Sequence, residues 1–271
     1  MKYNLLNSIN TTTLFTVIGI VAALAVVFAV LILLVNKFCA VKEDEKAKAV
    51  QEHLAGANCG GCGFAGCADF AKALSEGTAN LNSCGATACK DKEKIAEILG
   101  IPFSATAEKV AVVKCAGGKN SKDKFTYVGN STCEALISAM GGNKVCPEGC
   151  LGNGSCVAAC SSNGVKVIDG VACIDKDICV ACGACVNKCP KHIIELIPKT
   201  AKVYVACSTK CKGKEVINAC SVGCIGCGLC AKNCPQGAIS IVDNLAVIDY
   251  DKCNGCLTCL NKCPRKCILK F

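Results

Sequence analysis

Cysteine provides most of the chemistry open to this chain, because 29 of its 271 residues are Cys and only two are His. The run C-x2-C-x2-C-x3-C-P occurs three times. Four thiolates can hold a 4Fe-4S cube, and this spacing is typical of such clusters. One run already favours an iron–sulfur cluster over a zinc ribbon, and three runs strengthen that preference. The runs are Cys179, Cys182, Cys185, Cys189 and Pro190; Cys224, Cys227, Cys230, Cys234 and Pro235; and Cys253, Cys256, Cys259, Cys263 and Pro264.

In bacterial ferredoxins, three cysteines of such a run bind one cube and the fourth binds the neighbouring cube. A tight loop points three sulfurs at one cluster, and the cysteine before proline starts the segment that reaches the other. The last two runs therefore predict a pair of cubes with crossed ligands. The predicted sets are Cys224, Cys227, Cys230 with Cys263, and Cys253, Cys256, Cys259 with Cys234.

The run at Cys179 needs a partner upstream. Three cysteines there match the spacing of Cys224, Cys230 and Cys234, but Asn153 replaces the middle cysteine. Cys146 lies four residues before Cys150 and is well placed to supply the missing thiolate. The predicted sets are Cys146, Cys150, Cys156 with Cys189, and Cys179, Cys182, Cys185 with Cys160.

A fifth quartet has a different, glycine-rich spacing within ANCGGCGFAGC. Glycines let the backbone wrap closely around a cluster and donate N–H groups to its sulfurs. Zinc is the alternative occupant, and Cys89 is the alternative to the fourth ligand. The predicted ligands are Cys59, Cys62, Cys67 and Cys84.

Nine cysteines are not needed by these five sets, and a single cysteine is more often a small buried apolar residue than a ligand. Three of them, Cys207, Cys211 and Cys220, could join a further residue in a sixth site. The others are Cys39, Cys89, Cys115, Cys133, Cys173 and Cys267.

An uncharged stretch precedes all the quartets. Residues 13–35 are dominated by Val, Ala, Leu and Ile, and as a helix they would rise about 34 Å, enough to cross a bilayer. A cleaved signal peptide has a shorter apolar segment followed by small residues, whereas Asn36, Lys37 and Phe38 follow here. The same three residues do not fit a lipidated Cys39. The sequence therefore predicts an uncleaved membrane anchor.

The positions of the lysines predict the orientation of this anchor in the membrane. Only Lys2 precedes the apolar stretch, whereas Lys37, Lys42, Lys46 and Lys48 follow it closely, which places the C-terminal part in the cytoplasm. Thiols stay reduced in that compartment, so the cysteines indicate metal ligands rather than a secreted disulfide scaffold. We expect a single-pass protein of the plasma (inner) membrane with its clusters on the cytoplasmic side.

The cytoplasmic part shows an imperfect duplication from Lys109 onward, with KVAVVKC opening one copy and KVYVAC the other. Before it, residues 40–56 suggest an amphipathic helix, residues 91–99 a short helix and residues 104–107 a linker. The expected fold is α+β. Its predicted parts are a transmembrane anchor (1–37), a connector (38–56), a mostly helical 4Fe-4S domain (57–100), and two ferredoxin-like two-cluster modules (101–200, with an inserted segment, and 201–271).

Taken together, the N-terminal span, the CGGCGFAGC quartet and the ordered runs after it resemble the B subunit of the Rnf complex over nearly the whole chain. That complex is a membrane ferredoxin:NAD oxidoreductase, a translocase coupling electron flow to sodium or proton transport. The resemblance implies that reduced ferredoxin delivers electrons to the C-terminal clusters, and that the Cys59 quartet passes them to other membrane subunits. Many relatives resemble a single pair of runs, whereas two pairs occur here.

The residues themselves favour electron transfer without a substrate-converting site. His192, which follows Pro190, is expected to be structural. The Gly117–Gly118 and Gly141–Gly142 pairs lack the spacing of a dinucleotide-binding turn, so we expect neither NAD nor flavin on this chain. Five 4Fe-4S clusters would carry the chemistry. The alternative function is a membrane-tethered polyferredoxin serving another oxidoreductase.

The formal charge of +9 suggests nucleic acid or anionic lipid as a partner, but it counts every cysteine as neutral. An oxidised cube with four thiolates carries about −2, so five cubes add about −10 and leave the holoprotein near −1. The lysines and arginines are then expected to offset cluster charge or to dock an acidic ferredoxin. We therefore expect no nucleic-acid partner.

Overall fold

The computed structural model describes residues 11–39, 44–103 and 108–271. The chain divides into two compact units, of which the first contains helix α1 (Thr11–Cys39) and the second spans Glu45–Phe271. The predicted linker at 104–107 and the first residues of the predicted connector helix, 40–43, lie outside the described residues.

Helix α1 is long and apolar enough to cross a membrane. Its candidate span, Leu14–Leu34, has a mean hydropathy of 3.3, and its side chains are exposed along the whole length. As an α-helix, 21 residues rise about 32 Å, which matches the hydrocarbon thickness of a bilayer. An exposed apolar surface of this length is stable in lipid, because water would not solvate it.

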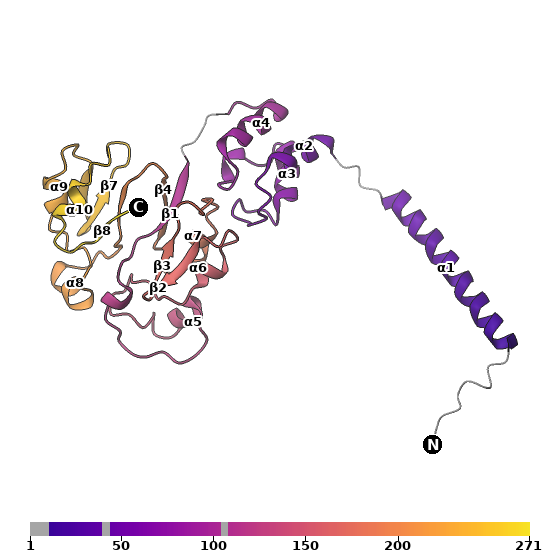
Figure 1. Ribbon diagram of the computed structural model, residues 1–271, viewed down its shortest axis with the longest axis horizontal. Helices are drawn as coiled ribbons and strands as arrows, with labels where there is room; N and C mark the ends of the chain where they lie inside the picture. Colours follow the sequence, from indigo (N-terminus) through magenta and orange to yellow (C-terminus); the bar gives the residue numbers. More distant parts are fainter. Residues whose placement is uncertain (1–10, 40–43, 104–107) are drawn as a thin grey trace, which may run out of the picture. The chain divides into compact units, whose positions relative to one another are not determined.

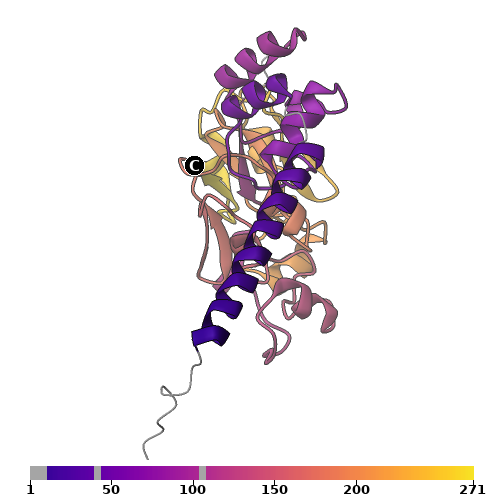
Figure 2. The same cartoon turned by 90° about the vertical axis from the view of Figure 1, so that its right-hand side faces the viewer.

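The second unit begins with a small helical part, whose helices group together in both views (Figures 1 and 2). Its core contains Val50, Phe70, Leu74 and Ile95 from three different helices. The predicted helix at 91–99 is observed and starts two residues earlier, at Cys89. The elements are α2 (Glu45–His53), α3 (Cys67–Ser75), the 3-10 helix η1 (Leu81–Ser83) and α4 (Cys89–Leu99).

The rest of the chain contains two copies of one strand arrangement, and Figure 1 labels the four strands of the first copy. In each copy the first strand pairs antiparallel with the last, and a β-hairpin lies between them in the sequence. The two predicted opening strands are β1 and β5. The first copy contains β1 (Lys109–Val113), β2 (Val165–Ile168), β3 (Val171–Ile174) and β4 (Ile194–Pro198); the second contains β5 (Val203–Val205), β6 (Ile239–Val242), β7 (Leu245–Ile248) and β8 (Ile268–Lys270).

The two hairpins turn in the same way. Asp169 and Gly170 join β2 to β3 with φ angles of 51° and 77°, and Asp243 and Asn244 join β6 to β7 with φ angles of 49° and 63°. Left-handed conformations at both central positions favour the tight turn whose twist matches that of paired strands. The conformational match supports a duplication of structure as well as of sequence.

Short helices follow the cysteine loops, and a residue in the left-handed conformation precedes each of them. This residue is glycine in three loops and Leu257 in the fourth. These helices are α6 (Ser155–Ala158), α7 (Ala184–Lys188), α9 (Leu229–Lys232) and α10 (Thr258–Lys262), and the connecting segments contain η2 (Gly118–Asn120), α5 (Cys133–Ser138) and α8 (Gly213–Ala219).

Cysteines form much of the core of each copy. In the second copy they provide five of the twelve buried residues of the main apolar cluster, beside Val203, Ile239 and Leu245. In the first copy Cys150, Cys156, Cys185 and Cys189 are buried in the same way. A core built on thiols has little apolar volume of its own, so groups bound by these thiols would be part of the packing.

Candidate iron–sulfur sites

The cysteines of the glycine-rich quartet surround one cavity in the helical part. Cys59, Cys62, Cys67 and Cys84 all line it, and all are free thiols. The Asn58 side-chain oxygen accepts a hydrogen bond from the Cys67 backbone N–H (2.8 Å), which closes the loop between them. The structure thus brings together the four residues predicted from spacing, here called the Cys59 site.

The last two runs meet as the crossed-ligand hypothesis groups them. Cys224, Cys227, Cys230 and Cys263 line one cavity, the Cys224 site. Cys267 lines the same cavity, with its Sγ atom 3.5 Å from that of Cys263. A hydrogen bond with Cys267 lowers the pKa of Cys224 to about 6. Cys267 is one of the nine cysteines outside the sets predicted from spacing, and it occupies the position that Ala238 has after the preceding Cys-Pro pair.

The partner set, the Cys253 site, contains Cys253, Cys256, Cys259 and Cys234. Burial raises the pKa of Cys259, and the nearby sulfurs of Cys253 and Cys256 raise it further. Cys234 and Cys253 both pack against the apolar cluster that contains Cys259. Cys253 and Cys256 therefore lie near Cys259, and Cys234 packs on the same apolar cluster of the second copy.

In the first copy, Cys160, Cys179, Cys182 and Cys185 form the Cys179 site. Burial raises the pKa of Cys185 to about 11, and the charges of the other three sulfurs contribute in the same direction. A backbone N–H from Ala181 also points at the Cys179 sulfur, at an N···Sγ distance of 3.4 Å. These are again the residues grouped by crossed ligation.

The remaining set differs from its sequence assignment. Cys150, Cys156 and Cys189 line one cavity, and the fourth cysteine in its wall is Cys133. Cys146 lines a different cavity, together with Cys115. No spacing rule connects Cys133 to this set, because it belongs to the inserted segment and the path of that segment is a tertiary feature. The set with Cys133 is here called the Cys150 site.

A chain of polar contacts holds Cys133 in this wall. Its backbone N–H donates to the Ser155 hydroxyl oxygen (2.9 Å), and the Ser155 hydroxyl donates to Glu134 (2.5 Å). Lys188 forms an ion pair with Glu134 at 2.9 Å. The bond from Ser155 and then Lys188 lower the pKa of Glu134 to about 2. Because Ser155 and Lys188 belong to α6 and α7, Cys133 is fastened to both cysteine loops of the first copy.

The Cys59 site lies against the Cys179 site. A Cβ atom at Gly61 would come within 1.9 Å of the Cys182 carbonyl oxygen, and one at Gly85 within 2.2 Å of the Ala181 carbonyl oxygen. The sulfur of Cys59 also adds to the raised pKa of Cys182, which burial raises most. Two glycine loops of the helical part therefore touch the cysteine loop of the first copy.

The donor chemistry of these sites fits iron–sulfur clusters. Burial raises the pKa of Cys156 to about 12 and that of Cys150 to about 11, so both are neutral thiols at pH 7 unless a cation binds. Metal binding would require their thiolates and would release protons. A bound 4Fe-4S cube supplies one-electron transfer. The protein residues supply the thiolates, the backbone N–H donors to sulfur and the exclusion of water.

Comparisons with known proteins locate iron–sulfur chemistry in the same regions. A family model described as a putative Fe-S cluster matches residues 54–85, and one described as a 4Fe-4S dicluster domain matches residues 223–267. The first range holds the Cys59 site, and the second holds the Cys224 site and the Cys253 site. The mixed helix and strand content predicted for the chain is confirmed.

Curated relatives align with almost the whole chain. The B subunit of the Na+-translocating ferredoxin:NAD+ oxidoreductase complex of Acetobacterium woodii is 37% identical, with 93% of this chain and 76% of the relative covered. The B subunit of the proton-translocating ferredoxin:NAD+ oxidoreductase complex of Clostridium ljungdahlii is 39% identical, with 93% of this chain and 90% of the relative covered. The B subunit of the ion-translocating oxidoreductase complex of Methanosarcina acetivorans is 35% identical, with 93% of this chain and 96% of the relative covered. Identity at this level over this length shows that the chain belongs to the family of ion-translocating oxidoreductase (Rnf) complex B subunits.

Proposed function

We propose that this chain is the iron–sulfur electron-transfer subunit of an ion-translocating ferredoxin:NAD+ oxidoreductase complex. The observation that carries the proposal is the set of thiol-lined cavities distributed through the second unit of a chain with a candidate membrane helix. Its relatives are named as subunits of such complexes. Other subunits of the complex are therefore its partners, and electrons are its only cargo.

Five cubes account for twenty thiols. The Cys59, Cys179, Cys224 and Cys253 sites keep their sequence-based ligands, and Cys133 takes the place of Cys146 in the Cys150 site. Cys133 supports this assignment better because it lines the same cavity as Cys150, Cys156 and Cys189. Crossed ligation through Cys160 and Cys189 joins the Cys150 and Cys179 sites, and crossed ligation through Cys234 and Cys263 joins the Cys224 and Cys253 sites.

Electrons enter from reduced ferredoxin at the C-terminal copy and leave from the Cys59 site toward the membrane subunits. Contact of Gly61 and Gly85 with the loop at Cys182 supports the last step, because it brings the Cys59 and Cys179 sites together. With the anchor at Leu14–Leu34 and the lysine bias after it, the clusters face the cytoplasm.

Exposed lysines of the second copy form the surface to which ferredoxin docks in this proposal. Several lysines of the second copy are exposed, including Lys232, Lys252 and Lys262. Ferredoxin carrying a net negative charge would be steered to such a surface, with an ionic-strength-dependent rate. The negative charge of the cubes offsets the formal +9 of the whole chain, so the attraction depends on these lysines rather than on the net charge. The formal charge then gives no reason to propose a nucleic-acid partner.

Measurement of electron transfer through the purified complex tests this function. Cys62→Ala removes one ligand of the Cys59 site. We expect ferredoxin still to reduce the C-terminal clusters, whereas reduction of the membrane subunits stops. Unimpaired turnover of the variant complex would refute the exit role, and purification without any flavin-bearing or NAD-binding subunit would instead support a tethered polyferredoxin.

A further inference from the structure

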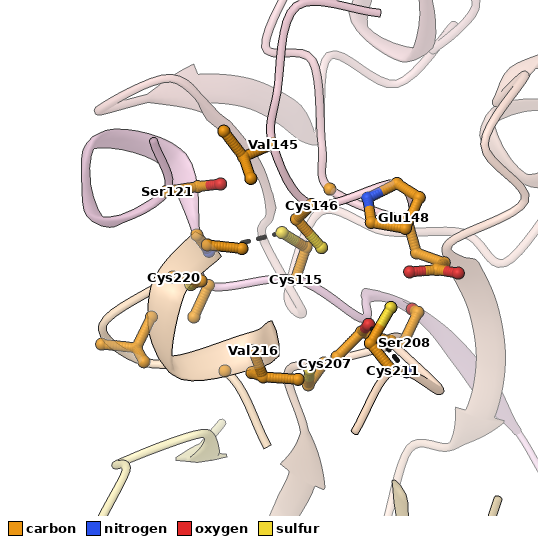
Figure 3. A pocket seen from close by; sticks show the side chains of 18 of the residues that line it. Cys115, Ser121, Val145, Cys146, Glu148, Cys207, Ser208, Cys211, Val216 and Cys220 are labelled. Carbon is orange, nitrogen blue, oxygen red and sulfur yellow. Dashed lines mark hydrogen bonds between the residues drawn. The ribbon is translucent and has the colours of Figure 1, made fainter. Parts of the chain in front are cut away.

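A second kind of thiol-lined cavity lies between the two copies (Figure 3). Its volume is about 190 Å³, and its walls contain residues that follow β1 in the first copy and β5 in the second. Figure 3 shows Cys115 beside Cys146, with the cysteines of the second copy along the other side. None of these thiols belongs to the five proposed sites. The cysteines of the wall are Cys115, Cys146, Cys207, Cys211 and Cys220.

Four of these five cysteines form two equivalent pairs. Cys115 stands two residues after the end of β1, and Cys207 stands two residues after the end of β5. Cys146 and Cys220 each precede the first cysteine of a cluster loop by four residues. The duplication thus supplies the same pair from each copy. Cys211 has no counterpart, because Lys119 is at its position in the first copy.

Backbone N–H groups point at this set in the same way from both copies. Cys150 N–H donates to the Cys115 sulfur (N···Sγ 3.4 Å), and Cys224 N–H donates to the Cys207 sulfur (3.3 Å). Gly117 N–H adds a second donor to Cys115 at 3.3 Å. Donors aimed at sulfur stabilise a thiolate and a cluster bound by it. Equivalent donors at equivalent cysteines indicate a built ligand set rather than incidental apolar packing.

The size of the cavity decides which occupant fits. A single water needs on the order of 10–15 Å³ of such space, so about 190 Å³ leaves room for a polynuclear group beyond one ion. Within the described residues, no three Cys, His, Asp or Glu side chains are placed to share a single metal ion. Cys207 and Cys220 are both 7% exposed, so water has little access to their sulfurs.

We propose that Cys115, Cys146, Cys207 and Cys220 bind a sixth 4Fe-4S cluster that bridges the two copies. The proposal deepens the proposed function and rests on its assignment of Cys133 to the Cys150 site. The bridging cluster lies between two existing sites, because its ligands Cys115 and Cys207 accept hydrogen bonds from Cys150 and Cys224. It therefore completes the relay from the second copy to the first.

Each step of this relay moves one electron. With cubes bound, one electron would pass from the Cys224 site to the site formed by Cys115, Cys146, Cys207 and Cys220, and from there to the Cys150 site. No bond forms or breaks and no proton moves, and reduced ferredoxin is the source of the electron.

Iron content of the full-length holoprotein, purified without oxygen, tests the proposal. Six cubes give about 24 iron atoms per chain. We expect Cys146→Ala and Cys133→Ala each to lose one cube and the double variant to lose two. The two single variants should also lack different EPR signals. Cys211→Ala is the matched control in the same cavity wall, and it should retain all six cubes.

Several results would overturn the proposal. Wild-type protein with about 20 iron atoms per chain, with or without one zinc, would exclude a sixth cube. If Cys146 and Cys133 served one cube, the double variant would lose no more iron than either single variant. Loss of a cube from Cys211→Ala would refute the symmetric ligand set. The iron and zinc content of the wild-type protein tests the sixth cube even if a variant does not fold. Neither metal measurement depends on ferredoxin, so failure of this proposal can be told apart from failure of the proposed function.

Discussion

Gly61 offers a direct test of the contact between the Cys59 and Cys179 sites. Its backbone is not in the left-handed region, so alanine would cause no backbone strain there. The effect of the substitution therefore comes from one clash. The new Cβ would lie 1.9 Å from the Cys182 carbonyl oxygen and 3.0 Å from its carbon. Both are backbone atoms that no rotamer change can remove. Since a Cβ contact much below 3.0 Å is not seen in folded proteins, Gly61→Ala must separate the two loops by about 1.1 Å.

Separation of the loops has two measurable consequences. Overpacking of this kind costs about 1–3 kcal/mol, which should lower the midpoint of chemical unfolding. Electron tunnelling decays exponentially with the distance between clusters, so reduction of the Cys59 site should slow while that of the C-terminal clusters is unchanged. Rapid-freeze EPR after mixing with reduced ferredoxin measures both rates, and iron content should remain that of the wild type.

Two glycines provide the matching variants. Gly85→Ala, whose Cβ would approach the Ala181 carbonyl oxygen at 2.2 Å, should behave like Gly61→Ala. Gly77→Ala is the control, because Gly77 has φ +72° and no atom within 4 Å of its Cβ position. It costs about 1–2 kcal/mol of backbone strain without touching the interface. Wild-type transfer in both interface variants, or equal slowing in the control, would refute the proposed contact between the sites.

Three further outcomes follow from other contacts. Arg265→Ala removes hydrogen bonds to the Cys220 (2.6 Å) and Gly223 (3.3 Å) carbonyl oxygens, and should lower the unfolding free energy by about 2–4 kcal/mol in denaturant titrations. Cys267→Ala should keep all the iron but lower the potential of the Cys224 site by tens of mV in redox-titrated EPR, because a donor 3.5 Å from the Cys263 sulfur is lost. Chelation of iron should abolish the strand signal in circular dichroism while α1 stays helical; retained strands would show that the thiol-rich core is stable alone.

The local patterns were strong predictors in this chain. The apolar stretch predicted for a membrane helix is helix α1, and the cysteines of the glycine-rich quartet surround one cavity. The strands expected before Cys115 and Cys207 are β1 and β5. These features depend on neighbours a few residues apart. Backbone geometry over such short distances is set by the residue types themselves, so spacing alone carries the information.

Tertiary structure decided the features that join distant segments. Cys133 reaches the Cys150 site only because Ser155 and Lys188 hold α5 against the first copy, and no rule of spacing encodes those contacts. Cys115 and Cys220 likewise meet only where the two copies pack together. The sequence alone predicted iron–sulfur clusters and an apolar helix long enough to cross a membrane. Which thiols share a cavity depended on the path of the long inserted segment, and that path is fixed by packing and buried hydrogen bonds rather than by local propensity.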